Sequence, residues 1–323
     1  MTFEVLCLVL VLLFLWHYLV VPTDSFSLGS LSTATNAAQR ELVSRVYPAP
    51  AKESMASLSQ GITHFFIRGP KHGKRLVLVH GISVTGDIFP QVIQQLNDKG
   101  FLVLSYDLYG HGHSDSPGIP YTAEAFAIQL RDILDHVNWP RAILLGFSLG
   151  GVIALQFADV YPARVDKLVL VAPAGLKKAI PAAGRVFEIP TIGEMLFYTL
   201  GKRVLTARSR KHEKGLLVEP FKSQFVAHQQ LNINVNPGFL RTYYKVIRYG
   251  PIRFMESLYE SVAAKFGGRV LCIWGRQDTT APFEAESTAF RALMPEAKFL
   301  AFEGRHTVLA ERSDVIDCID KFC

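Results

Sequence analysis

The chain has 323 residues, of which 49% are hydrophobic, so it is long enough for one large α/β domain that carries an insertion. Its net charge of +6 is not accompanied by any nucleic-acid-binding motif, and we expect no nucleic-acid partner. Four cysteines are too few for a disulfide scaffold, and no CxxC, HExxH or clustered His/Cys spacing occurs, so we expect neither a metal nor a cofactor.

The N-terminus contains an apolar run without charged side chains, from Val5 to Val21. As a helix this run would span about 25 Å, near the short limit for crossing a bilayer. We expect residues 1–21 to be a retained membrane anchor. A cleaved signal peptide on a secreted chain is the alternative, but the run lacks a basic n-region and a small-x-small cleavage site. Residues 22–40, rich in Ser, Thr, Gly and Ala, are expected to form a flexible linker.

Beyond this linker, short apolar strands alternate with helical patterns. Helices are predicted to begin near Asp87 and after Thr122, because Asp and Thr are favoured N-caps. The alternation predicts a doubly wound, mostly parallel sheet, in which chemistry takes place beyond the carboxyl ends of the strands. The predicted strands are residues 61–68, 76–79, 101–106, 142–145, 167–171, 269–274 and 298–302.

A G-x-S-x-G sequence, residues 146–150, follows the fourth of these predicted strands and runs directly into a helical pattern. This context is typical of a nucleophile elbow, in which a sharp turn lifts a serine hydroxyl above the sheet. Gly146 and Gly150 leave room for the strand and the helix to approach each other. We therefore interpret Ser148 as a nucleophile, although a glycine-rich turn without catalytic function is the simpler alternative.

A nucleophilic serine needs a base and an acid that orients it. Asp278 follows the strand that ends at Trp274, and His306 follows the strand that ends at Phe302. Taken singly, these residues read equally well as an ordinary turn aspartate and a helix-end histidine. Together with Ser148 they occur in the order Ser, Asp, His, which favours a catalytic triad.

Two further predictions concern the loops around the serine. The backbone N–H groups of Leu149 and Ile82 are expected to form an oxyanion hole, one directly after the nucleophile and one in the loop after residue 79. Asp107 and Asp115, which follow the predicted strand of residues 101–106, are alternatives to Asp278 as the acid of the triad. We expect them instead to stabilise the loop in which they lie.

At this point the chain resembles the α/β-hydrolase superfamily, in its group of HG-type esterases and lipases. The resemblance implies an α/β-hydrolase fold with a core of residues 41–175 and 263–323, and with a helical cap inserted at residues 176–262. Its N-terminal run is similar to the anchor of membrane-bound monoacylglycerol-lipase-like members. The resemblance is carried by His80-Gly81, Asp107 with residues 110–114, the elbow around Ser148, residues 275–278 with Pro282, and residues 304–306 with Glu311.

The insertion is rich in aromatic and basic residues. We expect some of its aromatic side chains to line an acyl pocket and most of them to form the core of the cap itself. Residues 176–262 contain 14 Lys and Arg, 6 Glu and no Asp, so the basic character of the chain lies here. This basic surface is either a second contact with anionic lipid or simply a solvated face.

The sequence thus predicts a serine hydrolase that cleaves carboxylic esters through a Ser-His-Asp acyl-enzyme mechanism. The expected small-molecule substrate is a lipid or another apolar acyl ester, and the expected partner is the membrane. A thioesterase, an acyltransferase or a cofactor-free haloperoxidase would use the same three residues. A hydrolase-fold ligand receptor with slow turnover is the alternative outside the enzymes.

Overall fold

The computed structural model describes residues 27–34, 36–48, 54–177, 185–187, 192–215 and 221–323, together with the single residues 11, 15, 189 and 219. The predicted anchor, residues 1–21, therefore lies outside the described residues except for Val11 and Leu15. Among the helices within the described ranges, none is long and apolar enough to cross a membrane.

An eight-stranded sheet forms the centre of the molecule, with the strand order β1-β2-β4-β3-β5-β6-β7-β8. The strands from β4 to β8 are parallel, whereas β2 pairs antiparallel with both β1 and β4 at one edge. The predicted mostly parallel sheet is confirmed. The strands are β1 (Met55–Leu58), β2 (Gly61–Arg68), β3 (Lys74–Val79), β4 (Phe101–Tyr106), β5 (Ala142–Phe147), β6 (Val165–Val171), β7 (Val270–Gly275) and β8 (Lys298–Phe302).

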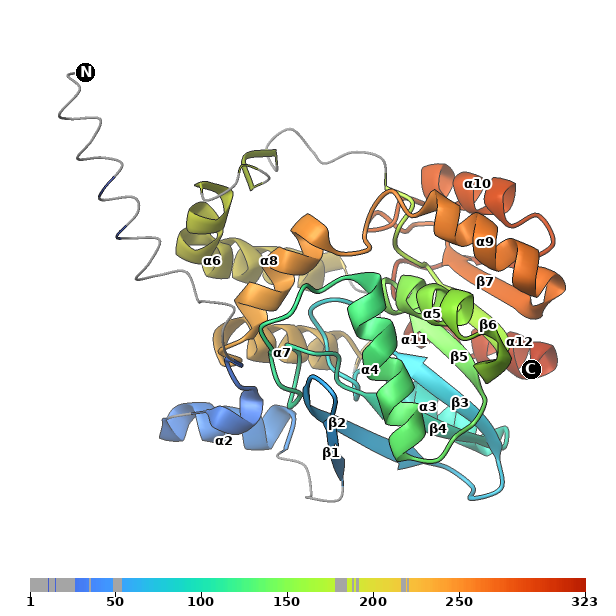
Figure 1. Cartoon of the computed structure of the whole chain (residues 1–323), viewed down its shortest axis with the longest axis horizontal. Helices are drawn as coiled ribbons and strands as arrows, with labels where there is room; N and C mark the ends of the chain where they lie inside the picture. Colours follow the sequence, from blue (N-terminus) through green and yellow to red (C-terminus); the bar gives the residue numbers. More distant parts are fainter. Residues whose placement is uncertain are drawn as a thin grey trace.

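Helices cover both faces of this sheet, because the central strands carry apolar side chains on both sides. In β3, for example, Val77 and Val79 face one layer of helices, while Leu76 and Leu78 face the other. The first layer consists of α4 (Ala123–His136), α5 (Leu149–Val160), α9 (Glu256–Phe266) and α10 (Phe283–Leu293). The second contains α3 (Pro90–Asp98), α11 (Val308–Glu311) and α12 (Ser313–Phe322) (Figure 1).

The two predicted helix starts have different outcomes. Thr122 is the N-cap of α4 and accepts a hydrogen bond from the N–H of Ala125 at 3.3 Å, as predicted. The helix predicted near Asp87 is present, but the N-cap assignment is wrong, since α3 begins at Pro90 with Phe89 as its N-cap. Proline suits the first helical position because it needs no hydrogen-bond acceptor there. Asp87 instead accepts a hydrogen bond from Arg68 of β2 at 2.6 Å.

Three helices, α6 (Ile192–Gly215), α7 (Phe221–Asn234) and α8 (Phe239–Tyr249), occupy the predicted insertion and lie together beside the carboxyl ends of the strands (Figure 1). They share a separate apolar cluster that includes Phe197, Leu205, Phe239, Tyr243 and Tyr244. The expectation that most aromatic residues of the insertion form its own core therefore holds for this cluster.

Part of the predicted linker packs against the rest of the chain. Leu28 and Leu31 donate backbone hydrogen bonds to the carbonyls of Ser116 and Gly112 at 3.1 and 3.0 Å. Further along, α2 (Ala37–Val46) and Tyr47 pack against α7, on which Leu231 contributes to the shared apolar cluster (Figure 1). Burial of side chains such as Leu31 explains why this segment is not a free tether.

Candidate active site

Ser148 lies in a sharp turn between β5 and α5. Its backbone has a φ of 54° and a ψ of −115°, a strained conformation for a residue with a side chain. A side chain at Gly150 would place its Cβ 2.0 Å from the carbonyl oxygen of Val79, and one at Gly146 would place it 2.3 Å from the carbonyl oxygen of Gly150. The turn therefore requires glycine on both sides, and the strand–turn–helix context predicted for a nucleophile elbow is present.

The loop after β3 approaches the serine equally closely. A Cβ built on Gly81 would lie 3.1 Å from the Cβ of Ser148, so the next residue, Ile82, is held beside the nucleophile. Leu149 is the first residue of α5, where the backbone N–H has no acceptor within the helix. Within the described part of the chain, neither the Ile82 nor the Leu149 N–H has a hydrogen-bond partner. Both donors are thus available to a developing oxyanion.

Asp278 and His306 follow β7 and β8, and the structure brings them together. His306 Nδ1 lies 2.7 Å from Asp278 Oδ2, and the Asp278 side chain is fully buried. The other carboxylate oxygen, Oδ1, accepts hydrogen bonds from the N–H groups of Thr280 and Ala281 at 2.8 and 2.9 Å. Asp278 is therefore a fixed acceptor that holds the Nδ1–H of the imidazole, which leaves Nε2 free to accept a proton.

The histidine and the serine open into one cavity of about 630 Å³. The imidazole packs against the ring of Phe147, the residue before the serine, with ring centroids 5.0 Å apart. The cavity lies between the carboxyl ends of the strands and the inserted helices, a common position for small-molecule sites. Its apolar lining consists of Ile82, Phe147, Leu205, Phe225, Ile233, Phe239 and Tyr243.

Ser83 is a cavity residue that the sequence did not reveal. It has a φ of 72°, and its N–H donates to His111 Nε2 at 3.4 Å. Its hydroxyl accepts a hydrogen bond from Gln229 of α7 at 3.2 Å, and Gln229 accepts one from Ser209 of α6 at 2.9 Å. This chain of polar contacts joins the loop after β3 to the inserted helices, so it fixes the cavity wall beside Ile82.

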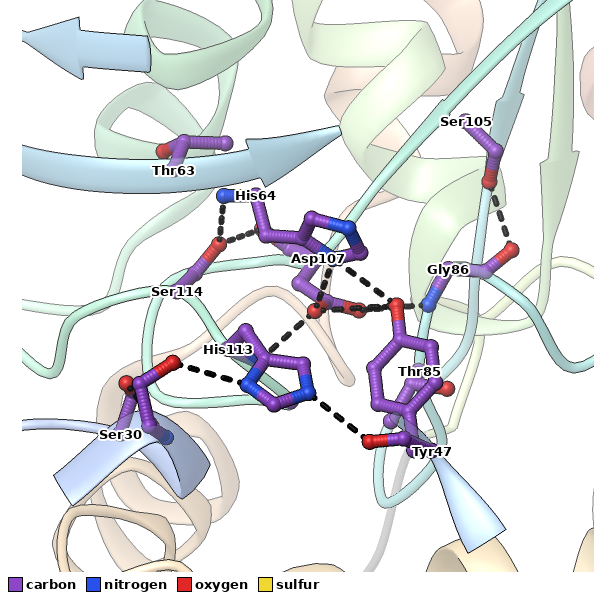
Figure 2. A network of polar contacts seen from close by, with 12 residues as sticks. Ser30, Tyr47, Thr63, His64, Thr85, Gly86, Ser105, Asp107, His113 and Ser114 are labelled. Atoms are coloured by element: carbon purple, nitrogen blue, oxygen red, sulfur yellow. Dashed lines mark hydrogen bonds and ion pairs between the residues drawn. The ribbon is translucent and has the colours of Figure 1, made fainter. Parts of the chain in front are cut away.

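Asp107 lies at the centre of a separate buried network (Figure 2). Its carboxylate accepts hydrogen bonds from the N–H groups of Gly86 and His113 at 2.7 and 2.8 Å. Tyr47 Oη and His64 Nδ1 lie within 3.1 and 3.0 Å of it. Burial favours the neutral acid, but the hydrogen bond and charge of His64 outweigh burial and hold the pKa of Asp107 below its usual range. As expected, Asp107 stabilises the loop in which it lies. Its contact with Tyr47 connects this loop to the N-terminal segment.

Several buried histidines support the same loops in their neutral form. Burial lowers the pKa of His111 to about 3 and that of His228 to about 4. His228 Nδ1 lies 2.6 Å from the hydroxyl of Thr85, and His111 Nδ1 lies 3.1 Å from the carbonyl of Tyr109. Within the described ranges, no group of three or more His, Cys, Asp or Glu is placed to hold a metal ion. His111 and His228 donate or accept hydrogen bonds that stabilise the surrounding loops.

We expect the protein to lose stability as the pH falls below about 6.5. The unfolded chain binds protons on His111 and His228 near that pH, whereas the folded chain binds them only near pH 3 and 4. The contribution of each neutral histidine to the unfolding free energy is therefore fully present above its pKa in the unfolded chain. It decreases as the pH falls toward its pKa in the folded chain. Between pH 7 and pH 4.5, each of the two histidines should lower the unfolding free energy by roughly 2–3 kcal/mol. Denaturant titrations at several pH values measure this decrease.

Replacing His228 with Gln should flatten this pH dependence, while the matched replacement of the exposed His72 should not. An unfolding free energy that stays constant from pH 7 to pH 4.5 would contradict the assignment of these histidines as buried and neutral.

Comparison with known proteins decides the family. The alpha/beta hydrolase fold family matches residues 74–313. The chain belongs to this family. An AB hydrolase superfamily protein of Bacillus subtilis is 28% identical over 224 residues, which are 68% of this chain and 80% of that protein.

Among solved structures, the fold is similar to that of a hydrolase from Pseudomonas aeruginosa, with a TM-score of 0.67 and 20% identity over 83% of this chain and 97% of that one. A bromoperoxidase from Bacillus anthracis also gives a TM-score of 0.67, with 21% identity over 83% of this chain and 98% of that one. These likenesses establish the alpha/beta hydrolase fold. The narrower resemblance to HG-type and monoacylglycerol-lipase-like members stays a prediction.

Proposed function

We propose that the chain is a serine hydrolase that cleaves carboxylic esters through an acyl-enzyme. The observation that supports this most directly is the 2.7 Å contact between His306 Nδ1 and Asp278 Oδ2 in the wall of the cavity that Ser148 also lines. A histidine held in this tautomer is a general base for a hydroxyl, and an elbow serine is the hydroxyl that it would activate.

In the proposed first half-reaction, Ser148 Oγ attacks the ester carbonyl carbon while its proton passes to His306 Nε2. The carbonyl oxygen becomes an oxyanion and accepts hydrogen bonds from the Ile82 and Leu149 N–H groups. As the intermediate collapses, the bond to the alcohol oxygen breaks and His306 returns the proton to that oxygen. The acyl group then remains on Ser148.

In the second half-reaction, a water molecule takes the place of the alcohol. His306 accepts a proton from this water as its oxygen attacks the acyl carbon, and the same proton goes back to Ser148 Oγ when the acyl-enzyme breaks down. The products are the free acid and the original hydroxyl. Asp278 keeps the ring oriented and stabilises its cationic form throughout.

The apolar part of the cavity wall supports an apolar acyl chain as one part of the substrate. A series of p-nitrophenyl esters of increasing chain length tests this proposal. We expect kcat/KM to rise with chain length until the cavity is filled, because each buried methylene adds about 0.8 kcal/mol. No hydrolysis of any ester in the series would overturn the proposed function, and greater activity on matched thioesters would favour a thioesterase.

We further propose that residues 1–21 anchor the protein in a membrane, which rests on the apolar run from Val5 to Val21 alone. Carbonate extraction of membranes from cells that express the whole chain tests this. The protein should remain in the membrane pellet, and release into the supernatant would contradict an anchor.

A further inference from the structure

The cavity beside Ser148 carries charge of one sign. Its described lining includes three basic side chains, Lys177, Arg208 and Arg305, and no Asp or Glu. Lys177 follows β6, Arg305 directly precedes His306, and Arg208 lies on α6. Cations from both the core and the inserted helices therefore face the same space.

These cations are not held in close ion pairs. In the described part of the chain, none of the three forms an ion pair. Lys177 Nζ donates to the carbonyl oxygen of Thr280 at 2.6 Å. Its charge also acts on the buried carboxyl of Glu286, but burial raises the pKa of that carboxyl to about 7, so Glu286 is only a weak counter-ion. Arg208 is exposed on α6 and lines the cavity, and its charge acts on Tyr243, another lining residue.

A cavity whose charged side chains are all cationic attracts anions and disfavours cations, and low-dielectric walls strengthen this field. The apolar lining residues would suffice for a neutral fatty ester, and such a ligand would leave the three cations without an anionic partner. Arginine in particular forms paired hydrogen bonds with carboxylate and phosphate groups.

We propose that the substrate is an ester that carries a second, anionic group, a carboxylate or a phosphate, which Arg208, Arg305 and Lys177 bind while the ester lies at Ser148. This inference rests on the proposed serine hydrolase activity and narrows its substrate class. The negative group would also orient the ester in the cavity, because it fixes one end of the molecule at the three cations.

Two matched substrate pairs test the proposal and separate the two kinds of anion. Mono-p-nitrophenyl glutarate is compared with p-nitrophenyl valerate, which has the same chain length and lacks the carboxylate. Oleoylglycerol phosphate is compared with oleoylglycerol, which lacks the phosphate. We expect kcat/KM to be at least about tenfold higher for the anionic member of one pair or both, and added salt should reduce this preference.

Arg208→Gln and Arg305→Gln should each lower the ratio of anionic to neutral kcat/KM about tenfold. The ratio is the decisive quantity because general damage to the site lowers both activities together. Arg210→Gln is the matched control, since Arg210 lies exposed on the same helix and does not line the cavity. It should keep the ratio of the unmodified protein.

Binding of both p-nitrophenyl esters to Ser148→Ala, measured by calorimetry, gives a second test that does not depend on turnover. Tighter binding of the glutarate, weakened by Arg208→Gln, supports the proposal even if the esterase activity itself were absent. Equal binding of both esters, together with ratios near one in both substrate pairs, would overturn the anionic substrate while leaving the hydrolase proposal intact.

Discussion

Ser148→Ala should reduce ester hydrolysis by a factor on the order of 10⁴ to 10⁶ and leave the melting temperature nearly unchanged. Removal of the nucleophile of a triad has an effect of this size, because the remaining residues cannot form the acyl-enzyme. The fold should not change, since alanine is smaller than serine. The backbone strain at a φ of 54° is present with either residue.

Steady-state kinetics with a p-nitrophenyl ester and a thermal melt of the same preparation measure both effects. Ser44→Ala, on the exposed side of α2, is the control and should behave as the unmodified protein does. If folded Ser148→Ala keeps more than a hundredth of the activity, the hydrolysis takes place elsewhere.

Asp278→Asn should lower kcat by about 10⁴-fold, because the change reverses the tautomer of the histidine. The asparagine Oδ1 can still accept the hydrogen bonds that Asp278 receives from Thr280 and Ala281, so the loop should keep its shape. Its Nδ2 would then donate to His306 Nδ1 where the carboxylate now accepts. The proton of the ring would move to Nε2, which could no longer accept the proton of Ser148.

Asp115→Asn is the control for the alternative acids that the sequence offers. Asp115 Oδ2 accepts a hydrogen bond from the N–H of Ile62 at 2.9 Å, and Asp115 does not line the cavity that Ser148 and His306 share. We expect this variant to keep kcat within tenfold. Near-normal kcat in Asp278→Asn combined with a large loss in Asp115→Asn would show that the wrong acid has been assigned.

The positions of Ser148, Asp278 and His306 at one edge of the sheet could be predicted because each lies in the loop that follows a strand with a clear apolar pattern. Parallel strands end at the same edge of a sheet, so the three residues converge although they lie far apart in sequence. The glycines beside the serine were equally informative. A side chain at Gly150 would clash with main-chain atoms of the preceding loop, which are present whatever the residues there, so only glycine fits.

Other features depend on packing between segments that no local pattern connects. Tyr47 contacts Asp107 across 60 residues, and nothing in the sequence around Tyr47 indicates a partner. Strand β1 has only four residues, Met55–Leu58, which is too short for a recognisable alternation. The role of Arg208 depends on which side of α6 faces the core, and that helix has no clear apolar stripe.

Covalent labelling tests the central claim most directly, because it asks whether His306 makes the Ser148 hydroxyl nucleophilic. The protein is treated with a fluorophosphonate, and the adduct is counted by intact-protein mass spectrometry and located by peptide mapping. We predict one adduct per chain, on Ser148, formed at least about a thousandfold faster than in folded His306→Ala. A folded protein that forms no adduct, or that is labelled on another serine, would contradict the account.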